Sequence, residues 1–476
     1  MQTGVTYIPL WVKDAVFYQI FPERFSNGDT SNDPLNESSL RLNVEQWGKS
    51  PKGNNYFGGD LQGIIDRLDY LKELGITAIY LNPIFSAESN HKYNTNDYRI
   101  IDPIFGTNEL FDQFIKKCHE QNIRVVIDGV FNHVGTAFFA FQDVLRNGKD
   151  SKYASWFNIY SFPVVMKPKP NYECWWGYAS LPKLMVQNPE VKKYIFDITE
   201  YWTKKGIDGW RLDVPNEVPH EFWIEWRSLV KSINPECYIV GELWHDASPW
   251  LRGDQFDATM NYRFRDACLK FFAEGSISVK QFDQELEGTR SLYRTETNYA
   301  MQNLLGSHDT ERYLTLCNED IWRVKLSYLF QMTYLGAPMI YYGDEIGMEG
   351  GKDPDCRRTM IWDKKKWNTE LHEFVKNLIA LRNSSEVLRR GDFLSLQNNK
   401  NNDLVIFKRE LNNDSAVIVL NRSKKKINVE ISVGEKIQSL TEHFSGETII
   451  PKKSSISTTV PAYSGKIFLT AIKEKQ

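Results

Sequence analysis

The alternation of short strand-like runs with amphipathic helical stretches constrains the fold of this chain more than any other feature. Segments such as LQGIIDRLDYLKELG, whose apolar residues recur at helical spacing, separate runs that are rich in β-branched and aromatic residues. These runs lie at 16–20, 76–83, 124–133, 207–214, 238–244, 256–261, 303–309 and 337–345. Alternating strands and helices form parallel sheets, so eight such units predict a closed (β/α)₈ barrel.

Two segments depart from this alternation. Residues 134–185 are aromatic, contain Pro and Gly, and show no clear helical pattern before Asn188, which predicts a small insertion domain after the third strand. From about residue 386, alternating runs such as LVIFKRE and AVIVLNR predict a C-terminal antiparallel β-sandwich. We therefore expect the barrel at 1–133 and 186–385, the insertion at 134–185 and the sandwich at 386–476.

Composition and charge exclude several classes of protein. The 476 residues carry a formal net charge of −3, which gives no basic field for binding nucleic acid. The N-terminus resembles no signal peptide, and no apolar stretch reaches membrane-spanning length. The six cysteines include no CxxC pair. We expect reduced, mostly buried thiols in a cytoplasmic protein with neither nucleic-acid nor membrane partners.

Three carboxylates follow predicted barrel strands, where the chemistry of such barrels gathers: Asp213, Glu242 and Asp309. A single acid at such a place is more often a capping or loop residue, but three at strand ends favour a catalytic site. Cleavage of a glycosidic bond with retention needs an acid and a nucleophilic carboxylate about 5 Å apart. Arg211, two residues before Asp213 and on the same side of its strand, is expected to keep Asp213 ionised.

Four strings close predicted strands in order: DGVFNH at 128–133, GWRLDV at 209–214, GELW at 241–244 and LLGSHD at 304–309. Together they resemble the α-amylase superfamily, glycoside hydrolase family thirteen. The resemblance implies that Asp213 forms a covalent glucosyl-enzyme and that Glu242 acts first as acid and then as base. It further implies that Asp309 holds the 2- and 3-hydroxyls of the distorted sugar.

The same resemblance assigns binding roles around that sugar. His133 and His308 are expected to donate hydrogen bonds to the ring, and Tyr93 in NHKYNTNDY matches the aromatic platform beneath it. For an arbitrary histidine, a structural imidazole is the more common reading.

Further strings are similar to the cyclomaltodextrinase, neopullulanase and maltogenic amylase branch: FYQIFPERF, SLPKL at 180–184, VPNEV, GELWHDASPW and YYGDEIGMEGGKDPDCRR. The oligo-1,6-glucosidase branch usually shows a QPDLN-like string in place of LPKL. In this resemblance Glu217 and Trp244 shape the acceptor side, and Asp353 and Arg357 hold the sugar beyond the cleaved one. Solvated surface groups are the alternative for these four.

Relatives in this branch usually carry an N-terminal β-sandwich, which we expect to be absent because the first strand begins near residue 16. A monomer or weak homodimer that acts on open oligosaccharides follows from that expectation. Trp175 and Trp176, just before SLPKL, either stack on substrate or pack in the core.

A structural calcium site is also expected, with no organic cofactor. Hard oxygen ligands suit Ca²⁺, and the resemblance includes a calcium loop, although Asx-rich turns without metal are common. The candidate ligands lie in NGDTSND and GGD and are Asn27, Asp29, Asn32, Asp33, Gly58 and Asp60.

The expected function is therefore retaining hydrolysis of α-1,4 bonds, and of α-1,6 bonds to some extent, in maltooligosaccharides, cyclodextrins, pullulan or starch, with some transglycosylation. A 4-α-glucanotransferase is the nearest alternative, since it shares the covalent intermediate. A non-catalytic glucan-binding or transporter-associated relative is more remote, because all three carboxylates are present.

Overall fold

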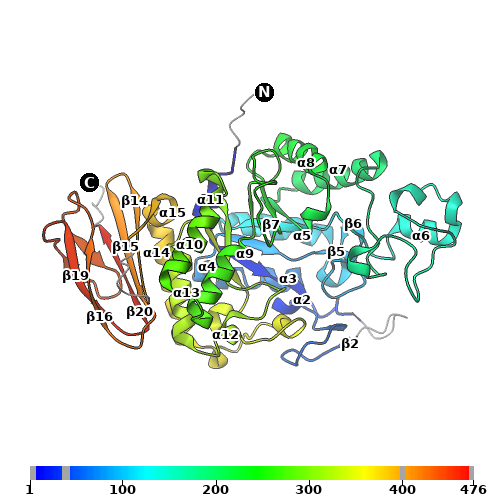
Figure 1. Ribbon diagram of the computed structural model, residues 1–476. Helices are drawn as coiled ribbons and strands as arrows, with labels where there is room; N and C mark the ends of the chain where they lie inside the picture. The colour runs from blue at the N-terminus through cyan, green and yellow to red at the C-terminus, as the bar shows by residue number, and fades with distance from the viewer. Residues whose placement is uncertain (1–6, 35–42, 397–402, 471–476) are drawn as a thin grey trace, which may run out of the picture. The chain divides into compact units, whose positions relative to one another are not determined.

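The computed structural model describes residues 7–34, 43–396 and 403–470 (Figure 1). Its chain forms two compact units. Unit 1 comprises Met1–Leu10, Phe17–Met260 and Lys352–Trp362, and unit 2 comprises Trp11–Val16, Asn261–Gly351 and Asp363–Gln476.

The parallel sheet contains all eight of the strands expected from the sequence. In unit 1 the pairing order is β1-β4-β7-β8-β9-β10, and in unit 2 β11 pairs with β12. The bounds are β1 (Phe17–Ile20), β4 (Ala78–Leu81), β7 (Arg124–Gly129), β8 (Gly209–Leu212), β9 (Tyr238–Gly241), β10 (Ala258–Thr259), β11 (Gln302–Leu304) and β12 (Ala337–Tyr341). Apart from Arg124, every residue of these strands is buried, as in a sheet covered on both faces.

Helices separate consecutive strands of the parallel sheet, except between β9 and β10, and this alternation confirms the (β/α)₈ barrel. In unit 1 they are α2 (Pro22–Phe25), α3 (Leu61–Ile65), α4 (Leu68–Leu74), α5 (Asn108–Glu120), α7 (Pro189–Lys204) and α8 (His220–Ile233). In unit 2 they are α1 (Trp11–Asp14), α9 (Tyr262–Cys268), α10 (Val279–Arg290), α11 (Thr295–Ala300), α12 (Tyr313–Leu316), α13 (Ile321–Thr333), α14 (Thr369–Ser384) and α15 (Glu386–Arg390). Side-chain caps start several of them: Thr107 accepts from the backbone N–H of Leu110 at α5, and Asn188 precedes Pro189 at α7.

The insertion after β7 contains a helix that the sequence reading missed. Helix α6 (Phe139–Asn147) precedes Asn188, so the expectation of no clear helix before that residue is wrong (Figure 1). Its buried residues Ala140, Phe141 and Val144 have helical spacing, but the run is short and aromatic, which blurs the periodic signal. Three short 3₁₀ helices follow, Gly148–Asp150, Ala154–Trp156 and Trp175–Gly177.

Two smaller strand pairs also belong to unit 1. They are β2 (Asn43–Val44) with β3 (Asn55–Tyr56), and the antiparallel pair of β5 (Phe85–Ala87) with β6 (Thr95–Ile101). The second pair matters for function because Tyr93 lies in the loop between its strands.

The C-terminal part of unit 2 is the expected antiparallel β-sandwich. One sheet has the order β13-β14-β15-β20-β17-β18, and the other pairs β16 with β19. The strands are β13 (Asp392–Ser395), β14 (Leu404–Leu411), β15 (Asp414–Asn421), β16 (Ile427–Ser432), β17 (Leu440–Glu442), β18 (Thr448–Ile449), β19 (Ser455–Val460) and β20 (Ser464–Thr470). Apolar side chains from both sheets, such as Val417 and Ile431, form one core. The domain boundaries given above stay a prediction.

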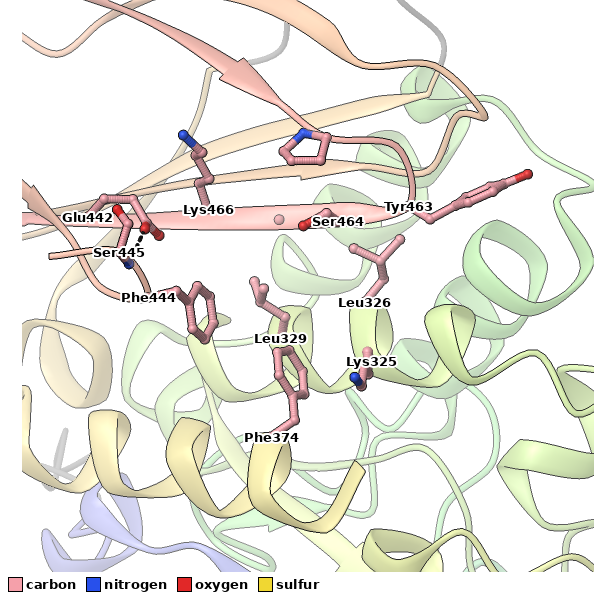
Figure 2. Close-up of a pocket in the computed structure, with 12 residues that line it drawn as sticks. Lys325, Leu326, Leu329, Phe374, Glu442, Phe444, Ser445, Tyr463, Ser464 and Lys466 are labelled. Atoms are coloured by element: carbon pink, nitrogen blue, oxygen red, sulfur yellow. Dashed lines mark hydrogen bonds between the residues drawn. The ribbon is translucent and has the colours of Figure 1, made fainter. Parts of the chain in front are cut away.

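A cavity of about 440 Å³ lies in unit 2 where α13 and α14 face the sandwich (Figure 2). Its floor is apolar, with Leu326, Leu329 and Phe374, and Lys325 and Lys466 stand at its edge. None of the residues that line it is a predicted site residue.

All six cysteines are free thiols, and only Cys174 is not fully buried. Among the described residues, no helix is long and apolar enough to cross a membrane.

Candidate active site

Asp213 and Glu242 lie side by side at the C-terminal ends of β8 and β9. The backbone N–H of Asp213 donates to Gly129 O at 3.1 Å, and that of Glu242 donates to Leu212 O at 3.0 Å. These bonds continue the parallel ladder one residue beyond each strand, which fixes where both side chains leave the sheet. Both residues are buried, 6% and 8% exposed, so their charges interact with little screening by water.

One guanidinium, that of Arg211, contacts both carboxylates. Its Nη1 lies 3.0 Å from Asp213 Oδ1 and 3.0 Å from Asp128 Oδ1, and its Nη2 lies 2.9 Å from Glu242 Oε2. Burial works against the charge on Arg211, but the attraction of Asp128 and Glu242 outweighs it and raises the pKa of Arg211 well above its usual value. The group is therefore a permanent cation between the acids.

The two catalytic candidates contact Arg211 differently. Asp213 accepts a hydrogen bond from Nη1, whereas Nη2 reaches Glu242 only at ion-pair distance and without hydrogen-bond geometry. The other Glu242 oxygen, Oε1, accepts the indole N–H of Trp244 at 3.0 Å. Asp213 and Glu242 are thus held by the same cation, and Trp244 provides a second donor to Glu242 alone.

Asp128 is a member of this cluster that the sequence reading did not single out. Cross-strand register pairs Asp128 with Arg211, and the hydroxyls of Tyr80 and Tyr93 donate to Asp128 Oδ2 at 2.7 and 3.0 Å. Tyr93 is thereby anchored beside the nucleophile's cation. Asp128 begins the string DGVFNH and could have been predicted from it. Nothing in the sequence marked Tyr80 except its place in a predicted strand.

His133 faces the nucleophile, with Nε2 4.0 Å from Asp213 Oδ2. Burial lowers the pKa of His133 to about 3, so the ring is neutral at ordinary pH. A neutral imidazole leaves the charge balance of the carboxylates unchanged and still offers one N–H donor.

Replacing His133 by Gln is expected to change how thermal stability depends on pH. An unfolded histidine protonates below pH 6.5, whereas this folded one does so only near 3, so acidification from pH 7 to 5 favours unfolding of the wild type by about 2 kcal/mol. The melting temperature of His133→Gln should therefore fall less than that of the wild type over this interval. Parallel falls in calorimetry at pH 7 and pH 5 would contradict a buried neutral ring.

Glu217 and Trp244 stand at the edge of the cluster. Glu217 ends the 3₁₀ helix Pro215–Glu217, directly after the nucleophile, and its Oε2 lies 3.1 Å from Lys183 Nζ. Lys183 also contacts Glu173 Oε1 at 3.0 Å and forms a β-bridge with His133. Trp244 is 40% exposed. Neither Lys183 nor Glu173 was predicted, although Lys183 is the lysine of LPKL.

Asp353 and Arg357 form an ion pair of 3.2 Å in unit 1. The backbone carbonyl of Arg357 accepts from Arg24 Nε at 3.0 Å, which fixes the segment. Burial, followed by the charge of Arg357, lowers the pKa of His91 to about 3, and the His91 ring stacks on Tyr93 with 5.8 Å between centroids. The charge of Arg357 therefore affects the loop that carries Tyr93. About half of the Asp353 side chain is exposed.

His308 and Asp309 lie together in unit 2, beyond β11. His308 Nε2 is 3.1 Å from Asp309 Oδ2, and the backbone N–H of Asp309 donates to Ser307 Oγ at 3.3 Å. His308 is buried, while the Asp309 side chain is partly exposed.

The six predicted calcium ligands do cluster. Asp60 caps α3 and accepts four hydrogen bonds, from the backbone N–H groups of Gly28, Asp29 and Gly63 and from the Asn32 amide. Gly58 has a φ of +80°, and a Cβ there would collide with Asn27 and Asp33.

The oxygen atoms of these residues suit a hard cation, but the site does not contain a cluster of acidic ligands. Asn27 Oδ1 and Asn32 Oδ1 are buried without a hydrogen-bond partner in the described residues. No group of three or more His, Cys, Asp and Glu side chains within residues 7–34, 43–396 and 403–470 is arranged to hold a metal. Amide and carbonyl oxygens would therefore supply much of the coordination.

A (β/α)₈ barrel with two carboxylates on one cation at adjacent strand ends is the arrangement that a glycoside hydrolase requires. Residues 19–391 match the family described as alpha amylase, catalytic domain, and residues 394–467 match the maltogenic amylase C-terminal domain. The chain belongs to the α-amylase family.

Its relatives fall in the expected branch. The chain is 52% identical to a cyclomaltodextrinase of Thermoanaerobacter pseudethanolicus over 89% of its own length and 73% of that protein. It is 49% identical to neopullulanase 2 of Thermoactinomyces vulgaris over 96% of its length and 78% of that protein. A solved structure of the cyclic α-maltosyl-(1→6)-maltose hydrolase of Arthrobacter globiformis superposes with a TM-score of 0.89 at 39% identity, covering 98% of this chain and 100% of that one.

Proposed function

We propose that this protein hydrolyses α-1,4-glucosidic bonds, and α-1,6 bonds to some extent, in maltooligosaccharides, cyclodextrins, pullulan or starch with retention of configuration. The observation that carries the proposal is the placement of Asp213 and Glu242 on one buried guanidinium at adjacent strand ends. Relatives named cyclomaltodextrinase and neopullulanase support the substrate class.

The reaction proceeds in two displacements. Glu242 protonates the departing glycosidic oxygen while Asp213 attacks the anomeric carbon, which gives a covalent glycosyl-enzyme. Glu242 then removes a proton from water, which attacks the same carbon and releases Asp213. Arg211 keeps Asp213 anionic, and the indole N–H of Trp244 orients Glu242.

Other side chains bind the sugar. Asp309 and His308 hold hydroxyls of the distorted ring, the role that the resemblance to the α-amylase family gives them. Tyr93 and His133 contact the ring at the nucleophile, Asp353 and Arg357 hold the next sugar, and Glu217 with Trp244 receives the leaving group or acceptor.

Product chromatography tests this function. The protein is incubated separately with γ-cyclodextrin, pullulan, soluble starch and maltotriose, and early products are separated. Ring opening of γ-cyclodextrin or panose from pullulan is expected. Longer oligomers that accumulate from maltotriose without an increase in the number of reducing ends would make the protein a 4-α-glucanotransferase. The absence of turnover with every substrate would contradict the proposal.

We also propose one structural Ca²⁺ at the cluster of Asn27, Asp29, Asn32, Asp33, Gly58 and Asp60, because the amide oxygens of Asn27 and Asn32 are buried there without a hydrogen-bond partner among the described residues. Calcium at 100 times its Kd is expected to stabilise the fold by about 2.7 kcal/mol. Calorimetry with calcium and with a chelator measures the shift, and Asn27→Ala with Asn32→Ala should abolish it. Equal melting temperatures in calcium and chelator would exclude a structural ion.

A cytoplasmic location is supported by the six free thiols, which a reducing compartment preserves. The partner of the chain in this proposal is an α-glucan oligosaccharide.

A further inference from the structure

An aromatic stack runs outward from the nucleophile through the insertion. The Trp175 ring stacks on His133 with 5.4 Å between centroids and 22° between planes, and Trp176 stacks on Trp175 at 4.8 Å and 12°. Because His133 lies 4.0 Å from Asp213, these rings connect the reacting centre with the insertion surface.

The outer ring of this stack is not part of a core. Trp176 is 77% exposed and Tyr178, whose ring lies 6.1 Å from that of Trp175, is 56% exposed. Exposed indoles are costly because so large an apolar surface meets water. Core packing, the alternative reading of the Trp pair, is therefore wrong for Trp176.

The backbone at Trp176 is also unfavourable for a side chain of its size. Its φ of +48° lies in the left-handed region, where bulky residues are outliers, and Gly177 follows with a φ of +79°. Strained conformations of this kind persist where the surroundings impose them and cluster at binding sites. Here the turn presents the indole outward on top of Trp175.

Charged side chains lie on the segments next to the stack, since Lys183 forms a β-bridge with His133 and Glu173 is two residues before Trp175. Lys183 joins Glu173 at 3.0 Å and Glu217 at 3.1 Å, and all three side chains are partly exposed. A flat apolar ring beside mixed donors and acceptors matches a glucose unit, which has an apolar C–H face and a rim of hydroxyls.

We propose that Trp176 is an outer subsite that stacks on a glucose unit of an α-glucan chain already engaged at Asp213. The inference rests on the proposed function, since it adds a contact for longer substrates of the same site. Two ring spacings, of 5.4 and 4.8 Å, separate Trp176 from His133, so a glucose unit on the outer face of Trp176 lies several units along the chain from the cleaved bond and is contacted mainly by longer substrates. Trp176 therefore sets the preference for chain length and takes no part in bond cleavage.

Steady-state kinetics of Trp176→Ala with maltotriose and maltoheptaose tests this subsite. KM for maltoheptaose should rise about tenfold, the loss expected for one aromatic contact of about 1.4 kcal/mol, while kcat and the values for maltotriose stay within twofold. Trp176→Phe should restore most of the loss. Tyr160→Ala, which removes a ring that is 65% exposed in the same insertion, is the matched control and should leave both substrates unaffected.

Equal losses on both substrates, or unchanged maltoheptaose kinetics, would overturn the subsite. Calorimetric binding of maltoheptaose to wild type and to Trp176→Ala tests it without turnover: about tenfold weaker binding by the variant supports it, and equal binding contradicts it. A wild type that binds maltoheptaose but cleaves neither sugar would overturn the proposed function. The subsite would then be decided by the binding comparison of wild type and Trp176→Ala alone.

Discussion

Replacing Asp213 by Asn is expected to lower kcat for maltooligosaccharides by roughly 10⁴-fold or more, because the amide cannot form the covalent intermediate. The substitution keeps the shape of the side chain, and Nη1 of Arg211, now 3.0 Å from Asp213 Oδ1, still has Asp128 as a partner. KM should change little. Initial-rate measurements with maltotriose check the size of the loss.

Asp197→Asn provides the control for this variant. Asp197 lies on α7, where it pairs with Lys193 at 2.6 Å and is partly exposed, so its loss should leave kcat within twofold. Circular dichroism and melting temperature must match between the two variants. An Asp213→Asn protein that keeps more than a tenth of wild-type kcat would remove Asp213 from the nucleophile's role.

Replacing Arg211 by Met is expected to damage stability and activity together. The side chain is fully buried, and its removal leaves Asp128, Asp213 and Glu242 without their shared cation. Breaking a buried ion pair in this way costs about 3 to 5 kcal/mol. Activity should fall by roughly 10³-fold or more, because the nucleophile and the general acid lose the cation that holds both in position.

Arg211→Lys separates charge from geometry. A lysine restores one positive charge but cannot place two nitrogens against two strand ends, so stability should recover in part while kcat stays low. Thermal melts and rates at several pH values check both effects. A methionine variant that melts with the wild type and keeps its kcat would show that the guanidinium does not organise the site.

Much of this architecture follows from local sequence. Most barrel strands are short apolar runs, so the carboxylates that directly follow two of them, Asp213 and Glu242, stand out from the other acids in the sequence. The contact between Arg211 and Asp213 follows from the two-residue period of a strand.

Contacts across strands are harder to predict. Asp128 faces Arg211 only because of the register between β7 and β8, which a single sequence does not specify. The same holds for Lys183, whose place beside His133 depends on an isolated bridge between the insertion and the barrel. Helix α6 was missed because a segment of nine residues is too short to show the helical period clearly.

The exposure of Trp176 also could not be predicted from the sequence. An aromatic pair reads equally as core or platform, and only the left-handed turn at Trp176 and Gly177 turns the ring outward.

Trapping the covalent intermediate tests the central claim most directly. In Glu242→Gln, α-maltosyl fluoride should still react, because fluoride leaves without an acid, whereas hydrolysis of the intermediate lacks its base. Mass spectrometry of the intact protein and its peptides should then find one maltosyl unit on the carboxylate of Asp213. Absence of an adduct under turnover conditions, or an adduct on another residue, would contradict the assignment of Asp213 as nucleophile.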